Sequence, residues 1–302
     1  MAQTAPTKLS DFSGFIHADQ AASIFDEARR MSVVQQLARQ VPLSYRGVEV
    51  PVTTSKPTAS WVAEGGQKPT TAGGKTLKTL TPKKLAAISV VSAEVIRANP
   101  AGYVNDLRLD LAEAFAIAFD AAALHGTSTP FGAGNYIGAT SKSVTLGTNA
   151  STAGGVFADI NDGLSLLVND GKKLTGFAFD SVAEPLFNGS VDSAGRPLFI
   201  DSPTTETAGP VRIGRVLGRP TFVGEGVEDG AGVVGFGGNW RQAAWGVVGG
   251  ITYDVSTQAT VTLDGALVSL FENNLVAIRA EAEYAFLVND AESFVAYEVS
   301  GS

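Results

Sequence analysis

Residues 61–94 read WVAEGGQKPTTAGGKTLKTLTPKKLAAISVVSAE, and this stretch contains the patterns that decide the fold. Its first part is rich in Gly, Thr and Lys, and no acidic residue occurs between Glu64 and Glu94. A segment this polar buries little of itself, so it predicts a long projecting hairpin or loop over 65–84. The run Leu85–Val91 is apolar and predicts a strand, and Ser92–Ile96 predicts a short helix after it.

Lysine is concentrated in this predicted hairpin. The net charge of the chain is -8, so the rest of the sequence carries a larger negative excess. A solvated loop is one interpretation. The favoured one is an arm that lies across an acidic part of a neighbouring copy, because long ordered loops in compact chains usually carry function. The predicted subunit-contact residues are Trp61, Glu64, Lys68, Lys75, Lys78, Lys83 and Lys84.

Upstream of the hairpin, residues 1–20 show no periodicity and predict an extended arm, followed by a short amphipathic helix over 21–31. Apolar residues alternate with Gly, Glu and Pro over 47–52, which predicts a strand with one buried face. Pro51 inside that run indicates an edge strand or a strand end. A second strand-like stretch ends at Gly65.

Downstream of the hairpin, Asn99-Pro100 opens the longest helical pattern, which ends near Gly126. Its apolar residues follow steps of three and four: Val104, Leu107, Leu111, Phe115 and Ala118. Four further elements are predicted, namely a helix over 156–169, a strand over 176–179, a helix over 264–274 and a last strand over 293–299.

Composition excludes several functional classes. Charged residues make up 17% of the 302 residues, below the roughly 25% that is usual. This composition fits a surface partly covered by sister subunits, and it equally fits a compact, uncharged monomer. Cysteine is absent, and the two histidines, His17 and His125, lie far apart, so neither a metal site nor a catalytic triad is expected. No apolar run approaches the roughly 20 residues that span a bilayer. An acidic chain is a poor nucleic-acid reader, and no G-x-G-x-x-G turn predicts a cofactor.

The order of several motifs resembles that of a known family. Trp61–Gly65 precedes the basic hairpin, Thr81–Ile88 and Val91–Glu94 follow it, and the long helix ends in a Gly-Thr-Ser-Thr-Pro turn at 126–130. Two downstream turns, at 192–198 and 216–220, and the segment Phe271–Glu281 also match. From about Ile24 onward, the chain resembles the major capsid proteins of tailed bacteriophages, which have the Hong Kong 97-type fold.

The resemblance implies an α+β fold in several parts: an N-terminal arm, an extended β-hairpin loop, a peripheral domain built around a long spine helix, and an axial α/β domain. The corresponding residues are 1–40 for the arm, 41–85 for the loop and its flanking strands, 86–130 for the peripheral domain, 131–269 for the axial domain and 270–302 for the return to the peripheral domain.

The resemblance also implies a function and partners. Copies of the chain are expected to assemble into hexamers and pentamers of an icosahedral virion shell around double-stranded DNA, without sequence-specific DNA binding, cofactors or a membrane. Synthesis is expected in the bacterial cytoplasm. Relatives with a fused scaffolding region carry a long, charged, helical N-terminal extension, whereas this sequence starts almost at the arm. The expectation is a separate scaffolding protein, or removal of such a segment before the mature sequence. A portal and a decoration protein are the other expected partners.

Some relatives join their subunits through isopeptide bonds between a loop lysine and an asparagine of a neighbour, with a glutamate as base seven residues after that asparagine. Asn274 and Glu281 have this spacing, and Lys68, Lys75 and Lys78 are the candidate nucleophiles. In the alternative interpretation, Asn274 caps a helix and Glu281 pairs with Arg279 or with a lysine of another subunit.

Three other classes compete with a phage capsid. An encapsulin-like nanocompartment would share the fold but enclose a cargo enzyme. A hydrolase or transferase would need a convergent nucleophile, base and oxyanion donors, for which the two histidines are poorly placed. Tail-tube and decoration proteins are usually smaller β-rich chains without a long helix. The sequence therefore favours a structural protein over an enzyme.

Overall fold

The computed structural model describes residues 7–9, 32–94, 100–149, 154–189, 200–201 and 212–299. The helices of these residues are α2 (Val33–Leu37), α4 (Pro100–Leu124), α5 (Gly155–Asn169) and α6 (Glu184–Asn188). The strands are β1 (Thr7–Leu9), β2 (Arg39–Gln40), β3 (Val48–Ser55), β4 (Gly74–Leu80), β5 (Lys83–Ser92), β6 (Ser143–Leu146), β7 (Gly176–Asp180), β8 (Ile200–Asp201), β9 (Arg212–Val216), β10 (Arg219–Gly224), β11 (Val233–Gly238), β12 (Ala243–Ser256), β13 (Thr260–Leu263), β14 (Ala266–Ser269), β15 (Leu275–Val288) and β16 (Phe294–Val299). The predicted helix over 21–31 lies outside the described residues, as do residues 95 and 96 of the short helix predicted over 92–96.

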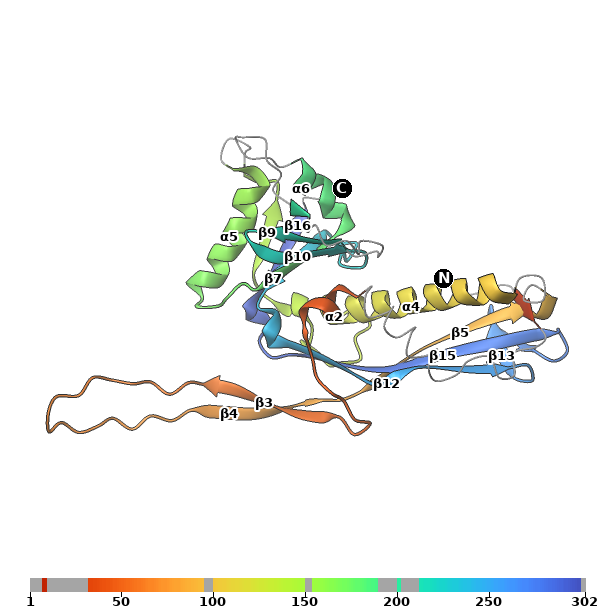
Figure 1. The fold of residues 1–302 in the computed structure, drawn as a ribbon, viewed down its shortest axis with the longest axis horizontal. Helices are drawn as coiled ribbons and strands as arrows, with labels where there is room; N and C mark the ends of the chain where they lie inside the picture. Colours follow the sequence, from red (N-terminus) through yellow and green to blue (C-terminus); the bar gives the residue numbers. More distant parts are fainter. Residues whose placement is uncertain are drawn as a thin grey trace.

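Two larger sheets organise the molecule. The first has the strand order β1-β5-β15-β12-β2, and its long antiparallel strands lie beneath the spine helix α4 (Figure 1). The second has the order β6-β16-β11-β7-β10-β9-β8 and carries α5. The β3–β4 hairpin forms a separate two-stranded sheet that projects away from both (Figure 1).

One apolar core joins the spine helix to the first sheet. Phe115 and Phe119 of α4 pack against Trp245 of β12 and against Tyr284 and Phe286 of β15. The aromatic rings around Phe119 meet at centroid distances of 5.2 to 6.3 Å, the range of favourable edge and tilted contacts. Of the apolar positions expected on one face of α4, Leu111 and Phe115 are buried and Leu107 is half-buried, but Ala118 is exposed, and Phe119 occupies the core instead.

Strand pairing places two segments differently from the expected domain division. β12, within the predicted axial range 131–269, pairs with β15 of the first sheet. β16, within the predicted peripheral return 270–302, pairs with β11 and β6 of the second sheet. Residues 294–297 of β16 are all buried, as suits a strand covered on both faces. The chain thus crosses between the sheets after Val288, where Asp290 caps a short 3-10 turn.

The predicted helix over 264–274 is wrong. β13 and β14 form a hairpin around Asp264 and Gly265, which have φ angles of 48° and 79°. An Asp-Gly pair with two positive φ angles is the signature of a tight type I′ hairpin turn, and it overrides the apolar spacing that suggested a helix. The second strand-like stretch before Gly65 is also not a strand, because residues 56–73 form the irregular tip of the projecting hairpin.

A close approach of α5 to β16 gives a testable prediction about packing. Tyr297 of β16 is fully buried, and its hydroxyl donates to the Ile160 carbonyl at 3.2 Å. A Cβ at Gly163 would lie 2.8 Å from Tyr297 Cζ. Alanine in a helix is normally favoured over glycine by about 1 kcal/mol, but here the overlap should dominate. We expect Gly163→Ala to destabilise the subunit by about 2 kcal/mol in urea unfolding.

Ser165→Ala is the matched control for Gly163→Ala, because Ser165 lies on the exposed side of the same helix. Its effect should stay within about 0.5 kcal/mol. If Gly163→Ala instead stabilised the subunit, then α5 and β16 would not be packed as closely as described.

Candidate subunit-contact surface

The projecting hairpin is exposed along most of its length. From Thr53 to Leu77 every residue is exposed except Gly74, which is half-buried. Trp61 has a relative exposure of 104% and Leu77 of 61%, which is unusual for large apolar side chains. The hairpin predicted from the sequence is therefore present. Between Thr53 and Leu77 it is not covered by the described residues, whereas its root is partly covered, with Leu80 fully buried.

The candidate lysines of the hairpin have different environments. Lys68 lies in the irregular tip and Lys75 lies near the start of β4, and both are exposed. Lys78 lies closer to the root, where its ammonium donates to the carbonyls of Asn289 at 2.8 Å and Val288 at 3.4 Å. Lys78 thus fastens the hairpin to the end of β15 in its own chain.

Lys83 and Lys84 belong to the first sheet rather than to the loop, because β5 starts at Lys83. Lys84 forms an ion pair of 3.1 Å with Glu281 on the neighbouring strand. Arg279 Nε lies 3.4 Å from the other carboxylate oxygen of Glu281. Hydrogen bonding to Asp254 and the charge of Glu281 raise the pKa of Arg279 above its usual value. Glu281 is therefore already paired with Lys84 and Arg279 of its own chain. The pair with Arg279 is the one that the alternative interpretation expected.

Asn274 and Glu281 do not meet within one chain. Asn274 has a φ of 53° and lies in the turn before β15, not at a helix end. Glu281 lies seven residues further along the chain, and an extended strand rises by roughly 3.4 Å per residue, so the two residues are about 24 Å apart along the backbone. Asn274 directly precedes Leu275, which pairs with Ser92 at the last residue of β5. The hairpin joins the other end of β5, where β4 leads into Lys83, so the two lie at opposite ends of the sheet.

The described residues contain no group of three or more His, Cys, Asp or Glu side chains that could hold a metal ion. His125 Nε2 contacts the Val227 carbonyl at 2.7 Å, and burial lowers the pKa of its imidazole. His17 lies outside the described residues. Within the described part, no helix is long and apolar enough to cross a membrane.

One structurally important carboxyl group was not singled out from the sequence. Asp120 of α4 is 1% exposed and accepts hydrogen bonds from Ser32 Oγ at 2.6 Å and from the Val33 and Val34 amides at 2.9 and 3.3 Å. These amides are unpaired donors of the first turn of α2. Asp120 therefore attaches α2, which follows the predicted arm helix, to the spine helix.

Comparison with known proteins agrees with this architecture. The model of the phage capsid family matches residues 13–299. The probable major capsid protein gp17 of Mycobacterium phage D29 is 47% identical, with 98% of this chain and 93% of the relative covered. The probable major capsid protein gp17 of Mycobacterium phage L5 is 44% identical, with 97% and 92% covered.

Solved structures show the same fold at lower identity. A chain of Gordonia phage Cozz has a TM-score of 0.70 and 22% identity, with 90% of this chain and 87% of that chain covered. A structure entitled capsid of empty GTA particle, computed with C5 symmetry, has a TM-score of 0.62 and 16% identity, with 98% and 95% covered. The expected α+β capsid fold is confirmed, and the chain belongs to the phage capsid family.

Proposed function

We propose that this chain is a bacteriophage major capsid protein that assembles into hexamers and pentamers of an icosahedral shell around double-stranded DNA. Family membership and the two gp17 relatives support the capsid role, which is structural rather than enzymatic. The observation that carries self-assembly is the uncovered β3–β4 hairpin. An isolated two-stranded hairpin is only marginally stable in water, so this one gains stability when it lies on another copy.

The proposed assembly is multivalent. Each hairpin contact is small, but a subunit that contacts several neighbours at once adds these contacts together, so the shell is stronger than any single interface. A separate scaffolding protein, a portal and a decoration protein are the proposed further partners, and the proposed location is the virion capsid after synthesis in the host cytoplasm. The relatives give no support to a nanocompartment, and DNA and a portal in purified particles would distinguish the two.

Negative-stain microscopy of the protein, expressed alone and then with its neighbouring genes, tests the proposal directly. Capsomer rings or icosahedral shells are the expected result under at least one of the two conditions. A monodisperse monomer under both conditions would overturn the proposal, and the enzyme interpretation would then have to be tested.

Charge reversal in the hairpin should impair assembly without unfolding the subunit. Reversal of Lys75 and Lys78 together is the simplest variant from the sequence, but Lys78 also binds the end of β15. Lys75→Glu alone isolates the contact between copies, because Lys75 is exposed. Lys75 is proposed to lie on an acidic part of the neighbouring copy, so Lys75→Glu would place like charges against each other. We expect this variant to lower the particle yield about tenfold. Sedimentation of assembly mixtures measures the yield.

Urea unfolding provides the control for Lys75→Glu. The unfolding free energy of the unassembled variant should stay within about 0.5 kcal/mol of the wild-type value, as for other exposed substitutions. A normal yield of particles would contradict the proposed role of Lys75, and a large loss of stability would assign the defect to folding.

The lysine–asparagine cross-link stays a prediction. Because Asn274 lies in the turn before β15 and Glu281 lies well inside this strand, the reacting groups would have to come from different copies. The amine of Lys68, Lys75 or Lys78 would form an amide bond with the Asn274 side-chain carbonyl carbon and release ammonia. Boiling mature particles in detergent should then give a ladder above the monomer. A single band near 31.2 kDa would exclude the cross-link.

A further inference from the structure

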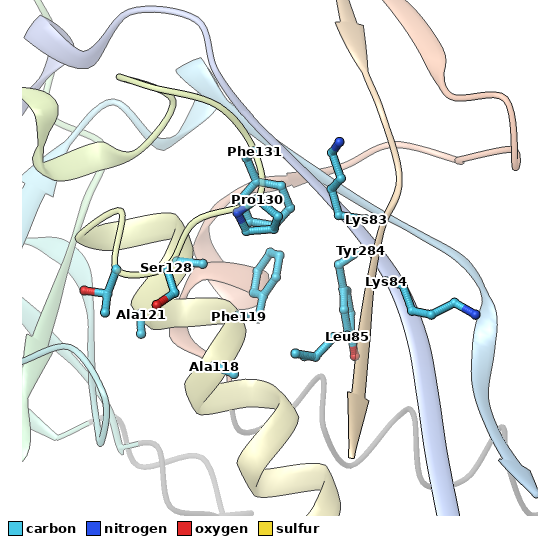
Figure 2. A pocket seen from close by; sticks show the side chains of 12 residues that line it. Lys83, Lys84, Leu85, Ala118, Phe119, Ala121, Ser128, Pro130, Phe131 and Tyr284 are labelled. Atoms are coloured by element: carbon cyan, nitrogen blue, oxygen red, sulfur yellow. The ribbon is translucent and has the colours of Figure 1, made fainter. Parts of the chain in front are cut away.

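A hollow opens between the spine helix and the root of the projecting hairpin. It has a volume of about 380 Å³ and is lined mainly by apolar side chains, among them Leu85, Phe119, Pro130, Phe131 and Tyr284. Figure 2 shows Phe119 and Leu85 facing each other across it, with Phe131 and Pro130 at one end and Lys83 beside them. We call this hollow the spine socket. Sites that hold one large side chain or ligand typically have this size and lining.

The hairpin tip presents a side chain of matching character. The chain has three tryptophans; Trp240 and Trp245 are buried, whereas Trp61 is fully exposed at the tip. A fully exposed tryptophan is costly in water, and tryptophan is the residue most enriched among energetically dominant contacts between proteins. Trp61 is therefore a candidate anchor for a second surface.

Trp61 cannot fill the spine socket of its own chain. The socket lies at Lys83, and β4 leads away from it over Gly74–Leu80 towards the tip. Nine residues of extended chain separate Lys83 from Gly74 and span about 30 Å. Figure 1 shows the tip pointing away from the body of the molecule. The anchor and the socket can meet only between two copies.

The charges beside the anchor and the socket are complementary. Glu64, three residues after Trp61, is the only acidic residue between Glu49 and Glu94. At the socket, Lys84 is paired with Glu281, but among the described residues no carboxylate lies within ion-pair distance of the Lys83 ammonium. A tip that inserts Trp61 would bring Glu64 to the side of the socket where Lys83 has a free charge.

We propose that Trp61 of one copy inserts into the spine socket of a neighbouring copy, with Glu64 of the inserted tip pairing with Lys83 at the rim. This inference rests on the proposed function and names the residues of one contact in the shell. Phe119 and Tyr284 are buried and pack against each other, so Trp61 would contact mainly Pro130, which is exposed, and Phe131 and Leu85, which are half-buried. The ion pair adds orientation more than affinity, as charges at an interface rim usually do.

Cysteine pairing tests the contact, because the chain contains no cysteine of its own. Ser60 precedes Trp61, and Ser128 is exposed and lines the socket, so Ser60→Cys with Ser128→Cys is nearly isosteric and retains the anchor. In assembled particles a short bismaleimide should link these cysteines into dimers and longer ladders on a denaturing gel. The matched control is Ser60→Cys with Ser165→Cys, whose second cysteine lies on the exposed face of α5.

The outcomes separate this inference from the proposed function. Ladders from the Ser128 pair, absent from the Ser165 pair and lost when Trp61→Ala is added, support the insertion. Particles that form normally but give no ladder from the Ser128 pair overturn it, although the capsid role stands. No particles from the wild-type chain under any condition would overturn the capsid role itself.

A charge exchange gives a second readout. Glu64→Lys and Lys83→Glu should each lower the particle yield about tenfold, because each places like charges together. The double variant should recover most of the yield, since it restores an opposite pair in reverse order. Equal loss in the double variant would show that Glu64 and Lys83 do not face each other. Tryptophan emission should also shift to the blue on assembly, and the shift should disappear in Trp61→Ala.

Discussion

Replacing Asp120 with alanine should destabilise the unassembled subunit by about 3 kcal/mol. The Asp120 carboxyl group accepts hydrogen bonds from Ser32 Oγ and from the Val33 and Val34 amides, and all of these groups are buried. Alanine would leave three buried donors without a partner, at a cost of about 1 kcal/mol or more each. Because these donors form the first turn of α2, the loss should also detach that helix from the spine. Urea unfolding and proteolysis between residues 32 and 40 measure the two effects.

Asp120→Asn is the informative control, because it keeps the shape of the side chain but has no titrating proton. Burial raises the pKa of Asp120 from 3.8 to about 7, against the lowering effect of the three hydrogen bonds. In the unfolded chain the carboxyl group is ionised above about pH 4, whereas in the folded subunit it keeps its proton up to about pH 7. Folding therefore takes up a proton between these values.

The sign of the resulting pH dependence follows from this proton uptake. The contribution of Asp120 to stability is fully present below about pH 4 and is lost as the pH rises to about 7, with a slope of up to about 1.4 kcal/mol per pH unit. Relative to wild type, Asp120→Asn should therefore become more stable between pH 5 and pH 7. Parallel profiles for the two proteins would show that Asp120 is ionised at pH 5 in the folded subunit.

The periodicity of apolar residues in the sequence was sufficient to predict those helices and strands that pack against a core. Four elements were predicted in this way, and the structure contains each of them: the spine helix, α5, β7 and the apolar run of β5. The projecting hairpin was predicted for the opposite reason, since its Gly, Thr and Lys content leaves nothing to bury. These predictions depend on local chemistry, which the sequence contains directly.

The remaining features depend on contacts between distant residues or on a turn signal that was not used. Asp264-Gly265 was a usable signal for the β13–β14 hairpin. By contrast, β16 enters the second sheet because of pairing with β6 and β11, segments more than 50 residues away, and no local pattern specifies that. The only sequence signal for Asp120 was a carboxylate among Phe and Ala on a helix, and its partners lie 86 to 88 residues away.

In the candidate contact surface, too, some features follow from the local sequence and others depend on contacts between distant residues. Exposure of Trp61, Glu64, Lys68 and Lys75 follows from the polar character of the hairpin and agrees with the prediction. The pairing of Glu281 with Arg279 agrees with the alternative interpretation. The own-chain contacts of Lys78 and the ion pair of Glu281 with Lys84 could not be predicted locally: Glu281 lies opposite Ala86, beside Lys84, only because β15 and β5 pair in that register. A spacing of seven residues between Asn274 and Glu281 gave no information about whether they lie on a strand or a helix.

Shortening the projecting hairpin should have the largest effect on assembly. Ser55 pairs with Gly74, so residues 56–73 can be replaced by a two-residue Asn-Gly turn that closes the strands directly. The removed residues are all exposed, so the subunit should unfold at nearly the same urea concentration. Particle yield should fall at least about a hundredfold, because every subunit loses a contact and the losses multiply across a multivalent shell.

A second variant distinguishes reach from chemistry in the same hairpin. Replacing residues 57–72 with Gly and Ser at unchanged length keeps a tip that can still extend, but it removes Trp61, Glu64 and Lys68. If the side chains of the tip supply the binding energy, both variants should fail to form shells when examined by sedimentation and microscopy. If only the shortened variant fails, the backbone and the strands supply the contact. Normal shells from the shortened variant would mean that the projecting hairpin does not join subunits at all, and its exposure would then need a different partner.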